Sequence, residues 1–410
     1  TLPGSKSLSH RALIAAALAD GVSRLRNLLR AEDTFYTAKA LMQLGVRYDW
    51  EGDICQVVGT GGRLLVPAEP LYLGDSGTSM RFLTAVVALG QGRYYLTGSA
   101  RLCQRPIQDL LNALAMLGVA ASTENHNGCP PVVVQAQGLA GGQARVSGRI
   151  SSQYLSAILL ISPFAAREVS IFVDGELVSR PYVDLTLGVM ADFGIAYYRR
   201  GYQCFSIPSG QRYHPREYEV EADASSASYF LGAAAITGGR VTLTNLNPNS
   251  CQGDIGFLKV LTAMGCQLEC GPEGVTLQGG PLQGIKVNMA DMPDLVPTLA
   301  VLAAFAEGET EITGVSHLRH KESDRLQAVA TELGKMGIAV RQTGDGLWIR
   351  GGRPQGAVIE TYKDHRIAMS FALAGLKVPG MVIQDPDCVA KSFPGFWDYL
   401  AKVAPGAVQD

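Results

Sequence analysis

The sequence predicts an α/β fold of six repeated units, arranged as two similar domains of three units each. Two series of local signals support this prediction. The first is a glycine that follows a predicted helix, and it recurs at Gly45, Gly118, Gly194, Gly265 and Gly337. The second is a polar helix start before a run of small apolar residues, and it recurs six times. Both series repeat every 68 to 76 residues, so six units fill the 410 residues.

The glycines mark the ends of one set of helices. Each stands between a helix-like and a strand-like segment, in triplets such as residues 44–46 and 336–338. Glycine is favoured there because the residue after a helix often takes a positive φ. The corresponding helix of the sixth unit is expected at residues 396–403.

The polar starts mark a second set of helices, one in each unit. Runs such as residues 230–236 are apolar on every side, which is typical of a buried helix. Three buried helices walled by three sheets would form one domain. Ser, Thr and Asp suit the starts because they accept hydrogen bonds from the free N–H groups of the first turn. The six starts lie at residues 5–7, 75–78, 151–153, 223–226, 291–294 and 362–365.

The composition predicts a soluble globular chain, with 47% apolar and 18% charged residues. A net charge of −2 argues against a nucleic-acid partner, so any anion site must be local. No apolar run is long enough to span a membrane, and no targeting peptide is recognised, so we expect a cytoplasmic protein without a membrane partner. The eight cysteines form no CxxC pair, which favours free thiols over disulfides or a zinc site.

Basic residues gather near the predicted helix starts. They are Lys6, Arg11, Arg81, Arg101, Arg105, Arg319, Lys321, Arg325, Arg366 and Lys391. A further helix is expected to begin at Pro106, because proline suits the first position. Cations at a helix start oppose the helix dipole, so several of them indicate a bound anion that offsets the repulsion. Ordinary solvated arginines remain an open alternative.

Nine short motifs, in order along the chain, resemble those of the 5-enolpyruvylshikimate-3-phosphate synthase (EPSP synthase) family. They lie at residues 3–11, 76–81, 105–107, 151–153, 180–182, 223–227, 321–326, 364–366 and 390–394. Each motif alone is a weak signal, but the combination is specific. The resemblance extends over essentially the full length of the chain.

The resemblance implies an enzyme that transfers the enolpyruvyl group of phosphoenolpyruvate to the 5-hydroxyl of shikimate 3-phosphate. Phosphate leaves through a tetrahedral intermediate, in a step of the shikimate pathway to chorismate and the aromatic amino acids. The implied fold has two domains of three βαβαββ units each, an inside-out α/β barrel, with the active site in the interdomain cleft. Residues 6–221 would form the first domain, and residues 1–5 with 222–410 the second. No cofactor, no metal, a monomer and inhibition by glyphosate are also implied.

The resemblance further assigns roles to single residues. Shikimate 3-phosphate is expected to meet Lys6, Ser7, Arg11, Ser151, Ser152, Gln153, Ser179, Tyr182, Asp294, His317 and Lys321. Phosphoenolpyruvate is expected to meet Lys6, Gly77, Arg105, Gln153, Arg325, Arg366 and Lys391. The expected catalytic residues are Glu322 as the acid, Asp294 with Lys321 as the base, Lys6 and His365. This set is physically sensible, because cations and helix starts offset the repulsion between two anionic substrates.

Some of these roles have structural alternatives. Lys321 and Arg325 beside Glu322 would lower the pKa of its carboxyl, so an acid role depends on bound anions or on burial. Asp294 could instead cap a helix, and His365 could make a local structural hydrogen bond.

Three residues depart from the common family pattern. Asp75 and His317 stand where asparagine is common, and Phe82 stands where proline is common. An acid at position 75 is unfavourable beside an anion site unless its carboxylate caps the helix, and Phe82 could tilt the helix after Gly77. We therefore expect the affinity for phosphoenolpyruvate, and for glyphosate, to differ from the common pattern.

Two other functions remain open from the sequence. The sister enzyme class transfers the enolpyruvyl group to UDP-N-acetylglucosamine and uses a reactive cysteine in a loop, for which Cys103 is the candidate. The serine–lysine–serine motif and residues 321–326 argue against this class. The other alternative is a non-catalytic anion-binding protein built from decayed repeats.

Overall fold

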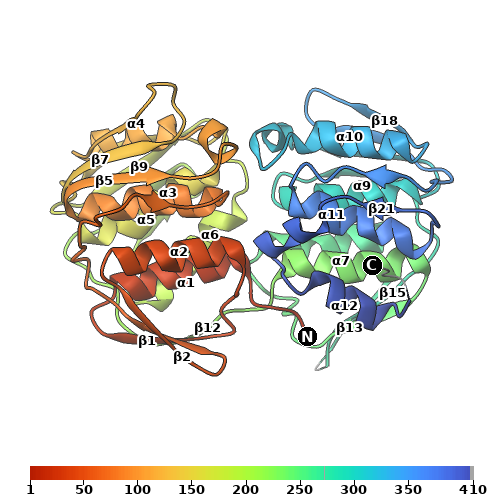
Figure 1. The fold of residues 1–410 in the computed structure, drawn as a ribbon, viewed down its shortest axis with the longest axis horizontal. Coiled ribbons are helices and arrows are strands. Elements are labelled where there is room, and N and C mark those ends of the chain that lie inside the picture. Colours follow the sequence, from red (N-terminus) through yellow and green to blue (C-terminus); the bar gives the residue numbers. More distant parts are fainter. Residues whose placement is uncertain (272, 407–410) are drawn as a thin grey trace. The chain divides into compact units, whose positions relative to one another are not determined.

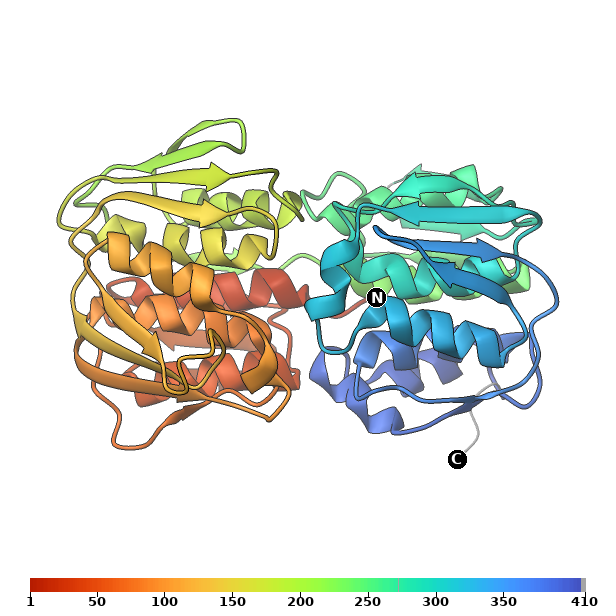
Figure 2. The ribbon, with the colours of Figure 1, turned by 90° about the horizontal axis from the view of Figure 1, so that it is seen from above.

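The structure, a computed structural model, describes residues 1–271 and 273–406 and consists of two compact units. The N-terminal unit is Gly4–Val220, and the C-terminal unit combines Thr1–Pro3 with the residues from Glu221 onward. In Figure 2 the first residues accordingly lie with the green-to-blue elements. The boundaries predicted from the sequence lie a residue or two from these. That each unit is a separate folding domain stays a prediction.

Helices and short strands alternate along the N-terminal unit. Its elements are α1 (Lys6–Leu18), β1 (Val22–Arg26), α2 (Glu32–Gln43), β2 (Arg47–Glu51), β3 (Ile54–Val58), β4 (Leu71–Tyr72), α3 (Gly77–Val86), β5 (Gln91–Thr97), α4 (Gln108–Met116), β6 (Ala120–Thr123), β7 (Val132–Gln137), β8 (Gly142–Ser147), α5 (Ser152–Ile161), β9 (Val169–Asp174), α6 (Pro181–Asp192), β10 (Tyr198–Arg200), β11 (Cys204–Ile207) and β12 (Glu217–Glu219).

Three four-stranded sheets wall this unit, with strand orders β4-β5-β7-β6, β8-β9-β11-β10 and β12-β1-β3-β2. In each sheet the first two strands are parallel and the other pairs are antiparallel, as expected of a βαβαββ repeat. The first strand of the third sheet is β12, so the end of the unit completes its own first repeat. β12 pairs with β1 at one edge of this sheet, and Figure 1 shows both strands in the same part of the unit.

The C-terminal unit repeats this alternation. Its elements are α7 (Ala224–Thr237), β13 (Arg240–Leu243), η4 (Gly253–Gly256), α8 (Phe257–Ala263), β14 (Gln267–Gly271), β15 (Gly274–Gln278), β16 (Lys286–Asn288), η5 (Pro293–Leu295), α9 (Val296–Ala304), β17 (Glu309–Thr313), η6 (Ser316–His320), α10 (Arg325–Lys335), β18 (Ala339–Gln342), β19 (Leu347–Arg350), β20 (Val358–Ile359), α11 (His365–Ala372), β21 (Val382–Ile383), η8 (Pro386–Lys391) and α12 (Phe396–Val403). The strand orders are β13-β15-β14, β16-β17-β19-β18 and β20-β21.

The helices after the polar starts form the core of each unit, as predicted. Every residue of α1 from Leu8 to Leu18 is buried, and so is every residue of α9. Burial removes this apolar surface from water and drives folding. Figure 1 shows α1 and α2 side by side, with α3 and α5 next to them. The longest helix in the part of the chain that the structure describes is α7, with 14 residues, which is too short to cross a bilayer.

The glycine series is confirmed. Gly45, Gly118, Gly194, Gly265 and Gly337 follow the ends of α2, α4, α6, α8 and α10, and all have a φ between 77° and 106°. A side chain with a Cβ rarely adopts this conformation, so glycine at each repeat lets the chain turn from helix to strand.

Five of the six predicted polar starts are capped helices. Ser5, Ser76, Ser151, Asp223 and Asp364 each accept a backbone N–H from the first turn of α1, α3, α5, α7 and α11. The start at residues 291–294 is different, because α9 has no side-chain cap and follows the 3₁₀ turn η5. The carboxylate of Asp294 binds two arginines there, as described below.

The helix start expected at Pro106 is wrong by two residues, because α4 begins at Gln108. The carbonyl of Pro106 is bound by side chains: it accepts from the hydroxyl of Tyr154 at 2.6 Å and from Nη2 of Arg81 at 3.2 Å. Asp75 does not cap α3 either, since Ser76 is the cap and Asp75 Oδ1 accepts from Ser99 Oγ at 2.9 Å.

Candidate active site

The starts of α1, α2 and α3 lie together at one end of the N-terminal unit. Lys6 Nζ forms a 3.0 Å salt bridge with Asp33 Oδ2 in the first turn of α2. Ser79, in the first turn of α3, donates to the carbonyl of Asp33 at 3.3 Å. The buried hydroxyl of Thr37 lies 2.8 Å from Nδ1 of His10 and 2.7 Å from Ser79 Oγ. No sequence motif indicated Asp33, which binds the ammonium group of Lys6 from the neighbouring helix.

The start of α5 adjoins the start of α3. Gln153 Nε2 donates to Thr78 Oγ1 at 3.0 Å, and the Ser151 hydroxyl caps α5 by accepting from the N–H of Gln153. Ser152 is buried in the same turn. The predicted residues 151–153 therefore lie at the same end of the unit as Lys6.

Gly77 is the first residue of α3 and lies against two buried arginines. A Cβ at this position would be 2.2 Å from Arg81 Nη1 and 2.6 Å from Arg105 Cζ, so a larger residue would displace a guanidinium group. The positive end of a helix and two guanidinium groups together favour an anion.

Arg11 is a buried cation whose side-chain hydrogen bonds within the described residues all go to uncharged oxygens. It donates to Thr186 Oγ1 at 2.7 Å and to the carbonyls of Ser7 at 2.8 Å and Tyr182 at 2.9 Å. These contacts engage three of its five N–H donors. Burial lowers the pKa of Arg11 to about 10. A phosphate at this position would supply the missing negative charge.

The predicted residues Ser179 and Tyr182 lie at the start of α6. Ser179 has a φ of 54°, which is uncommon for a non-glycine residue, and its carbonyl accepts from the N–H of Tyr182 at 3.2 Å. Because Tyr182 also binds Arg11 through its carbonyl, this turn is fixed to α1.

In the C-terminal unit, Arg325 is the centre of a buried ionic cluster. Its guanidinium group binds Asp294 Oδ1 at 2.8 Å, Glu322 Oε2 at 2.9 Å and Asp364 Oδ2 at 2.8 Å. Its side chain is 1% exposed. Burial lowers the pKa of Arg325, but the three carboxylates raise it well above its usual value. This residue is therefore always charged.

Asp294 links this cluster to Arg366, whose Nη2 lies 2.9 Å from Asp294 Oδ2. Arg366 also donates to the hydroxyls of Tyr229 at 3.3 Å and Ser225 at 3.4 Å in α7. The first turns of α7, α10 and α11 and the turn η5 thus meet around two guanidinium groups.

The other predicted residues of this unit lie on the same segments. Lys321 follows η6 and precedes Glu322. His317 is buried in η6, and burial together with the charge of Lys321 lowers its pKa to about 3, so its imidazole is neutral near pH 7. The ring of His365 is fully buried, with Nδ1 3.7 Å from Asp364 Oδ1. Lys391 is buried at the end of η8, which packs on α11.

Asp254, in η4, is a buried acid that sequence reasoning missed. Its Oδ2 accepts from the hydroxyl of Ser225, and its Oδ1 has no hydrogen-bond partner in residues 1–271 and 273–406. Burial and the nearby charge of Asp294 raise its pKa to about 7. Asp254 therefore carries a proton in the folded protein at pH values where it is ionised in the unfolded chain.

This raised pKa predicts a falling stability between about pH 4 and pH 7. In that range the folded state binds one proton more than the unfolded state, so unfolding becomes easier as the pH rises, by at most about 1.4 kcal/mol per pH unit. Asp254→Asn should remove this slope. The melting temperature of the variant should rise relative to that of the wild type from pH 5 to pH 8. A constant difference between the two melting temperatures over this range would contradict the raised pKa.

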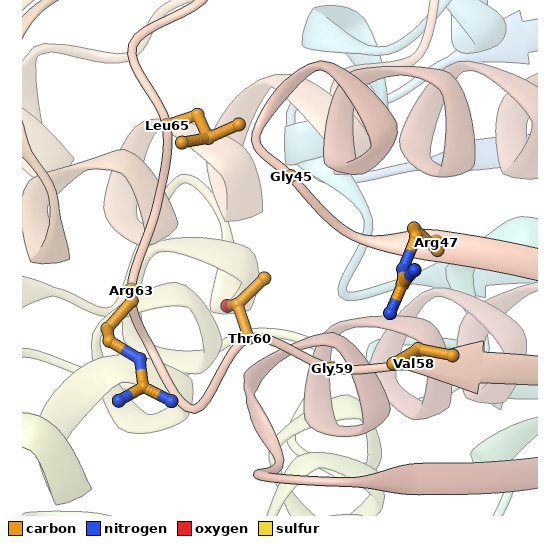
Figure 3. A pocket seen from close by; sticks show the side chains of 7 residues that line it. All are labelled: Gly45, Arg47, Val58, Gly59, Thr60, Arg63 and Leu65. Atoms are coloured by element: carbon orange, nitrogen blue, oxygen red, sulfur yellow. The ribbon is translucent and has the colours of Figure 1, made fainter.

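A pocket of about 290 Å³ in the N-terminal unit lies away from these residues. It is lined by Arg47, Thr60 and Arg63 among others, and Figure 3 shows the two arginines on separate segments with Thr60 between them. The N–H of Thr60 donates to the carbonyl of Ala17, so the pocket lies at the far end of α1, about 16 Å from Lys6. Arginines near the C-terminal ends of helices are favoured by the helix dipole, which explains them without a ligand.

Among the described residues, no three His, Cys, Asp or Glu side chains are grouped so that they could hold a metal ion. The carboxylates of Asp294, Glu322 and Asp364 face arginines.

Comparison with known proteins agrees with this arrangement. The family described as EPSP synthase (3-phosphoshikimate 1-carboxyvinyltransferase) matches residues 1–400. The 3-phosphoshikimate 1-carboxyvinyltransferase of Nostoc punctiforme is 46% identical over 399 residues, covering 97% of this chain and 94% of the relative. That of Syntrophobacter fumaroxidans is 47% identical over 406 residues, covering 98% and 96%.

A solved structure of EPSP synthase from Acinetobacter baumannii superposes with a TM-score of 0.82 at 34% identity, covering 98% of this chain and 94% of that one. This similarity confirms the predicted fold class. The match to the family extends over nearly the whole sequence, and the repeats, the capped helix starts and the two clusters of cations fit it. The chain belongs to the EPSP synthase family.

Proposed function

We propose that the protein transfers the enolpyruvyl group of phosphoenolpyruvate to the 5-hydroxyl of shikimate 3-phosphate and releases phosphate. This is the 3-phosphoshikimate 1-carboxyvinyltransferase reaction of the shikimate pathway. Family membership over the whole chain supports it, together with the buried cations at the helix starts of both units. The proposal also includes a monomeric, cytoplasmic enzyme that needs no cofactor.

In this proposal the N-terminal unit binds shikimate 3-phosphate. Arg11, with its two remaining N–H groups, and the polar residues at the starts of α1, α5 and α6 surround the phosphate and the ring. These residues are Lys6, Ser7, Ser151, Ser152, Gln153, Ser179 and Tyr182. The geometry of Arg11 is the single observation that carries this assignment. A buried guanidinium group without a carboxylate is expected to bind an anion, because burying an unpaired charge is unfavourable.

The same unit contributes Lys6, Gly77, Arg105 and Gln153 to the binding of phosphoenolpyruvate, and the C-terminal unit contributes Arg325, Arg366 and Lys391. Arg325 and Arg366 are paired with carboxylates in the structure, so the substrate has to compete with Asp294 and Glu322 for them. An anion that enters this cluster makes further negative charge there less favourable, which would favour the protonated form of Glu322 that an acid role requires.

The proposed chemistry needs one acid and one base. A proton adds to C3 of phosphoenolpyruvate, and the 5-hydroxyl oxygen forms a bond to C2 as its own proton passes to Asp294 or Lys321. The tetrahedral intermediate then loses phosphate from C2 and a proton from C3, which restores the double bond. We assign the proton at C3 to Glu322, with Lys6, His317 and His365 in supporting positions. Positioned groups of this kind replace a bimolecular collision by an ordered addition.

Phosphate release from phosphoenolpyruvate tests this function. We expect release only when shikimate 3-phosphate is present, with UDP-N-acetylglucosamine as the parallel acceptor. Release only with the sugar nucleotide would show that UDP-N-acetylglucosamine is the acceptor, and it would leave the assignment of the fold unchanged. Release with neither acceptor would favour an anion-binding protein.

We expect glyphosate to inhibit this reaction with an affinity that differs from the common pattern of the family. The ring of Phe82 is buried beneath Arg11, whose Cζ lies 5.1 Å from its centroid, and Asp75 Oδ1 accepts from Ser99 Oγ at 2.9 Å. Both departures therefore change the surroundings of Gly77 and Arg11. Glyphosate titrations in the phosphate-release assay measure the effect. An inhibition curve that matches a typical sensitive enzyme of the family would contradict the expectation.

A further inference from the structure

The segment between β20 and α11 has an unusual backbone. Tyr362 and Lys363, two consecutive non-glycine residues, have φ values of 56° and 55°. Residues with a Cβ adopt this left-handed conformation as isolated cases, because it crowds the Cβ against the backbone. Two in succession persist only when the surroundings hold them, and such strain is typical of functional sites. The next residue, Asp364, is the carboxylate that binds Arg325.

Glu332 holds this strained turn from α10. Its carboxylate is fully buried, and Oε1 accepts from the hydroxyl of Tyr362 at 2.7 Å. Its Oε2 accepts from the N–H of Glu360 at 3.1 Å and lies 2.8 Å from Nζ of the half-exposed Lys335. Burial and this hydrogen bond raise the pKa of Tyr362 to about 12, so the phenol keeps its proton and remains a donor.

Glu332 and Arg325 lie on the same buried side of α10, seven residues or two turns apart. Arg325 binds Asp364 through Nε at 2.8 Å and through Nη2 at 3.2 Å. Asp364 in turn caps α11 by accepting from the N–H of Arg366 at 3.0 Å. The segment 360–364 is therefore bound to α10 at two places. Glu332 binds the N–H of Glu360 and the hydroxyl of Tyr362, and Arg325 binds Asp364.

We propose that Glu332 is a positioning residue of the reaction. Together with the Tyr362–Lys363 turn it forms a clamp that fixes Asp364 and, through it, Arg325 and Arg366. An apolar side chain would fill this core position without the desolvation penalty of a carboxylate. The carboxylate instead supplies two directed hydrogen bonds to the turn. The inference rests on the proposed function, in which Arg325 and Arg366 bind phosphoenolpyruvate.

Steady-state kinetics of Glu332→Gln and Tyr362→Phe test the clamp. Each variant loses a hydrogen bond to the turn, which corresponds to a change of about three- to tenfold. We expect the KM for phosphoenolpyruvate to rise by this factor, while the KM for shikimate 3-phosphate stays within about twofold because Arg11 is in the other unit. Glu269→Gln, in an exposed pair with Arg240, is the matched control and should change neither constant.

Lys363→Gly provides a rescue. Glycine adopts the left-handed conformation without crowding, so the turn depends less on the hydrogen bonds from Glu332. In the Glu332→Gln background, Lys363→Gly should lower the KM for phosphoenolpyruvate again. A general gain in stability would not lower this one KM selectively.

The outcomes separate the clamp from the proposed function. If the wild-type protein releases no phosphate in response to shikimate 3-phosphate, the proposed function is refuted. With an active wild type, an unchanged KM for phosphoenolpyruvate in both variants would overturn the clamp. So would equal changes of both KM values together with a lower melting temperature, because these indicate a merely structural role. If Glu332→Gln does not fold, Tyr362→Phe tests the clamp alone. This variant should fold, because it loses only one hydroxyl and Tyr362 is 37% exposed.

Discussion

Arg325→Leu is expected to abolish activity and to destabilise the C-terminal unit strongly. The substitution leaves Asp364 fully buried without its main cation. It also removes the arginine that binds Glu322 and one of the two arginines that bind Asp294. Breaking a buried ion pair on one side typically costs about 3–5 kcal/mol, because the remaining charges stay desolvated. For a unit of this size the melting temperature should fall by on the order of 10 °C.

Differential scanning calorimetry and the phosphate-release assay measure both effects. Arg240→Leu is the matched control, because Arg240 pairs with Glu269 on the surface and both side chains are more than half exposed. Such a pair contributes at most about 1 kcal/mol, so the control should melt near the wild type and remain active. Equal melting temperatures for the two variants would show that the cluster around Arg325 does not stabilise the unit.

The repeat architecture could be predicted because its signals are local. A glycine after a helix and a cap before one are set by the backbone of a few residues, so Gly45 and its four counterparts, and starts such as Ser5 and Asp223, could be found without tertiary structure. The pairing of β12 with β1 could not be found in this way. It joins Arg24 to Glu217 across the unit, and three residues of strand carry too little pattern to specify a partner.

The site divides in the same manner. The cations at helix starts are visible in the sequence, and so are Asp294 and Glu322, but several acidic residues that hold the site are not. No sequence motif predicts three of these acidic residues: Asp33, which binds Lys6, Asp254, which binds Ser225, and Glu332, which binds Tyr362. The expected cap at residues 291–294 failed for a related reason. The carboxylate of Asp294 binds two guanidinium groups, whose full positive charges attract it more strongly than the partial charges of the N–H groups at a helix start.

Glu322→Gln is the complementary test, since it should remove catalysis and keep the fold. The amide oxygen of glutamine still accepts from Nη2 of Arg325, which the carboxylate binds at 2.9 Å, so the melting temperature should stay close to the wild type. The amide cannot supply a proton to C3 of phosphoenolpyruvate. Loss of a general acid lowers kcat by about 10²- to 10⁴-fold, and this is the expected size of the effect.

The fate of the C3 proton distinguishes this role from simple binding. In deuterated water, reversal of the addition step leaves deuterium at C3 of recovered phosphoenolpyruvate. If Glu322 is the acid, Glu322→Gln should lower this incorporation in parallel with kcat, with little change in the KM for either substrate. A variant that keeps kcat within about threefold would transfer the acid role to another group, for which Asp294, bound to both arginines, is the first candidate. Loss of affinity without loss of incorporation would instead make Glu322 a residue that only holds Arg325 in place.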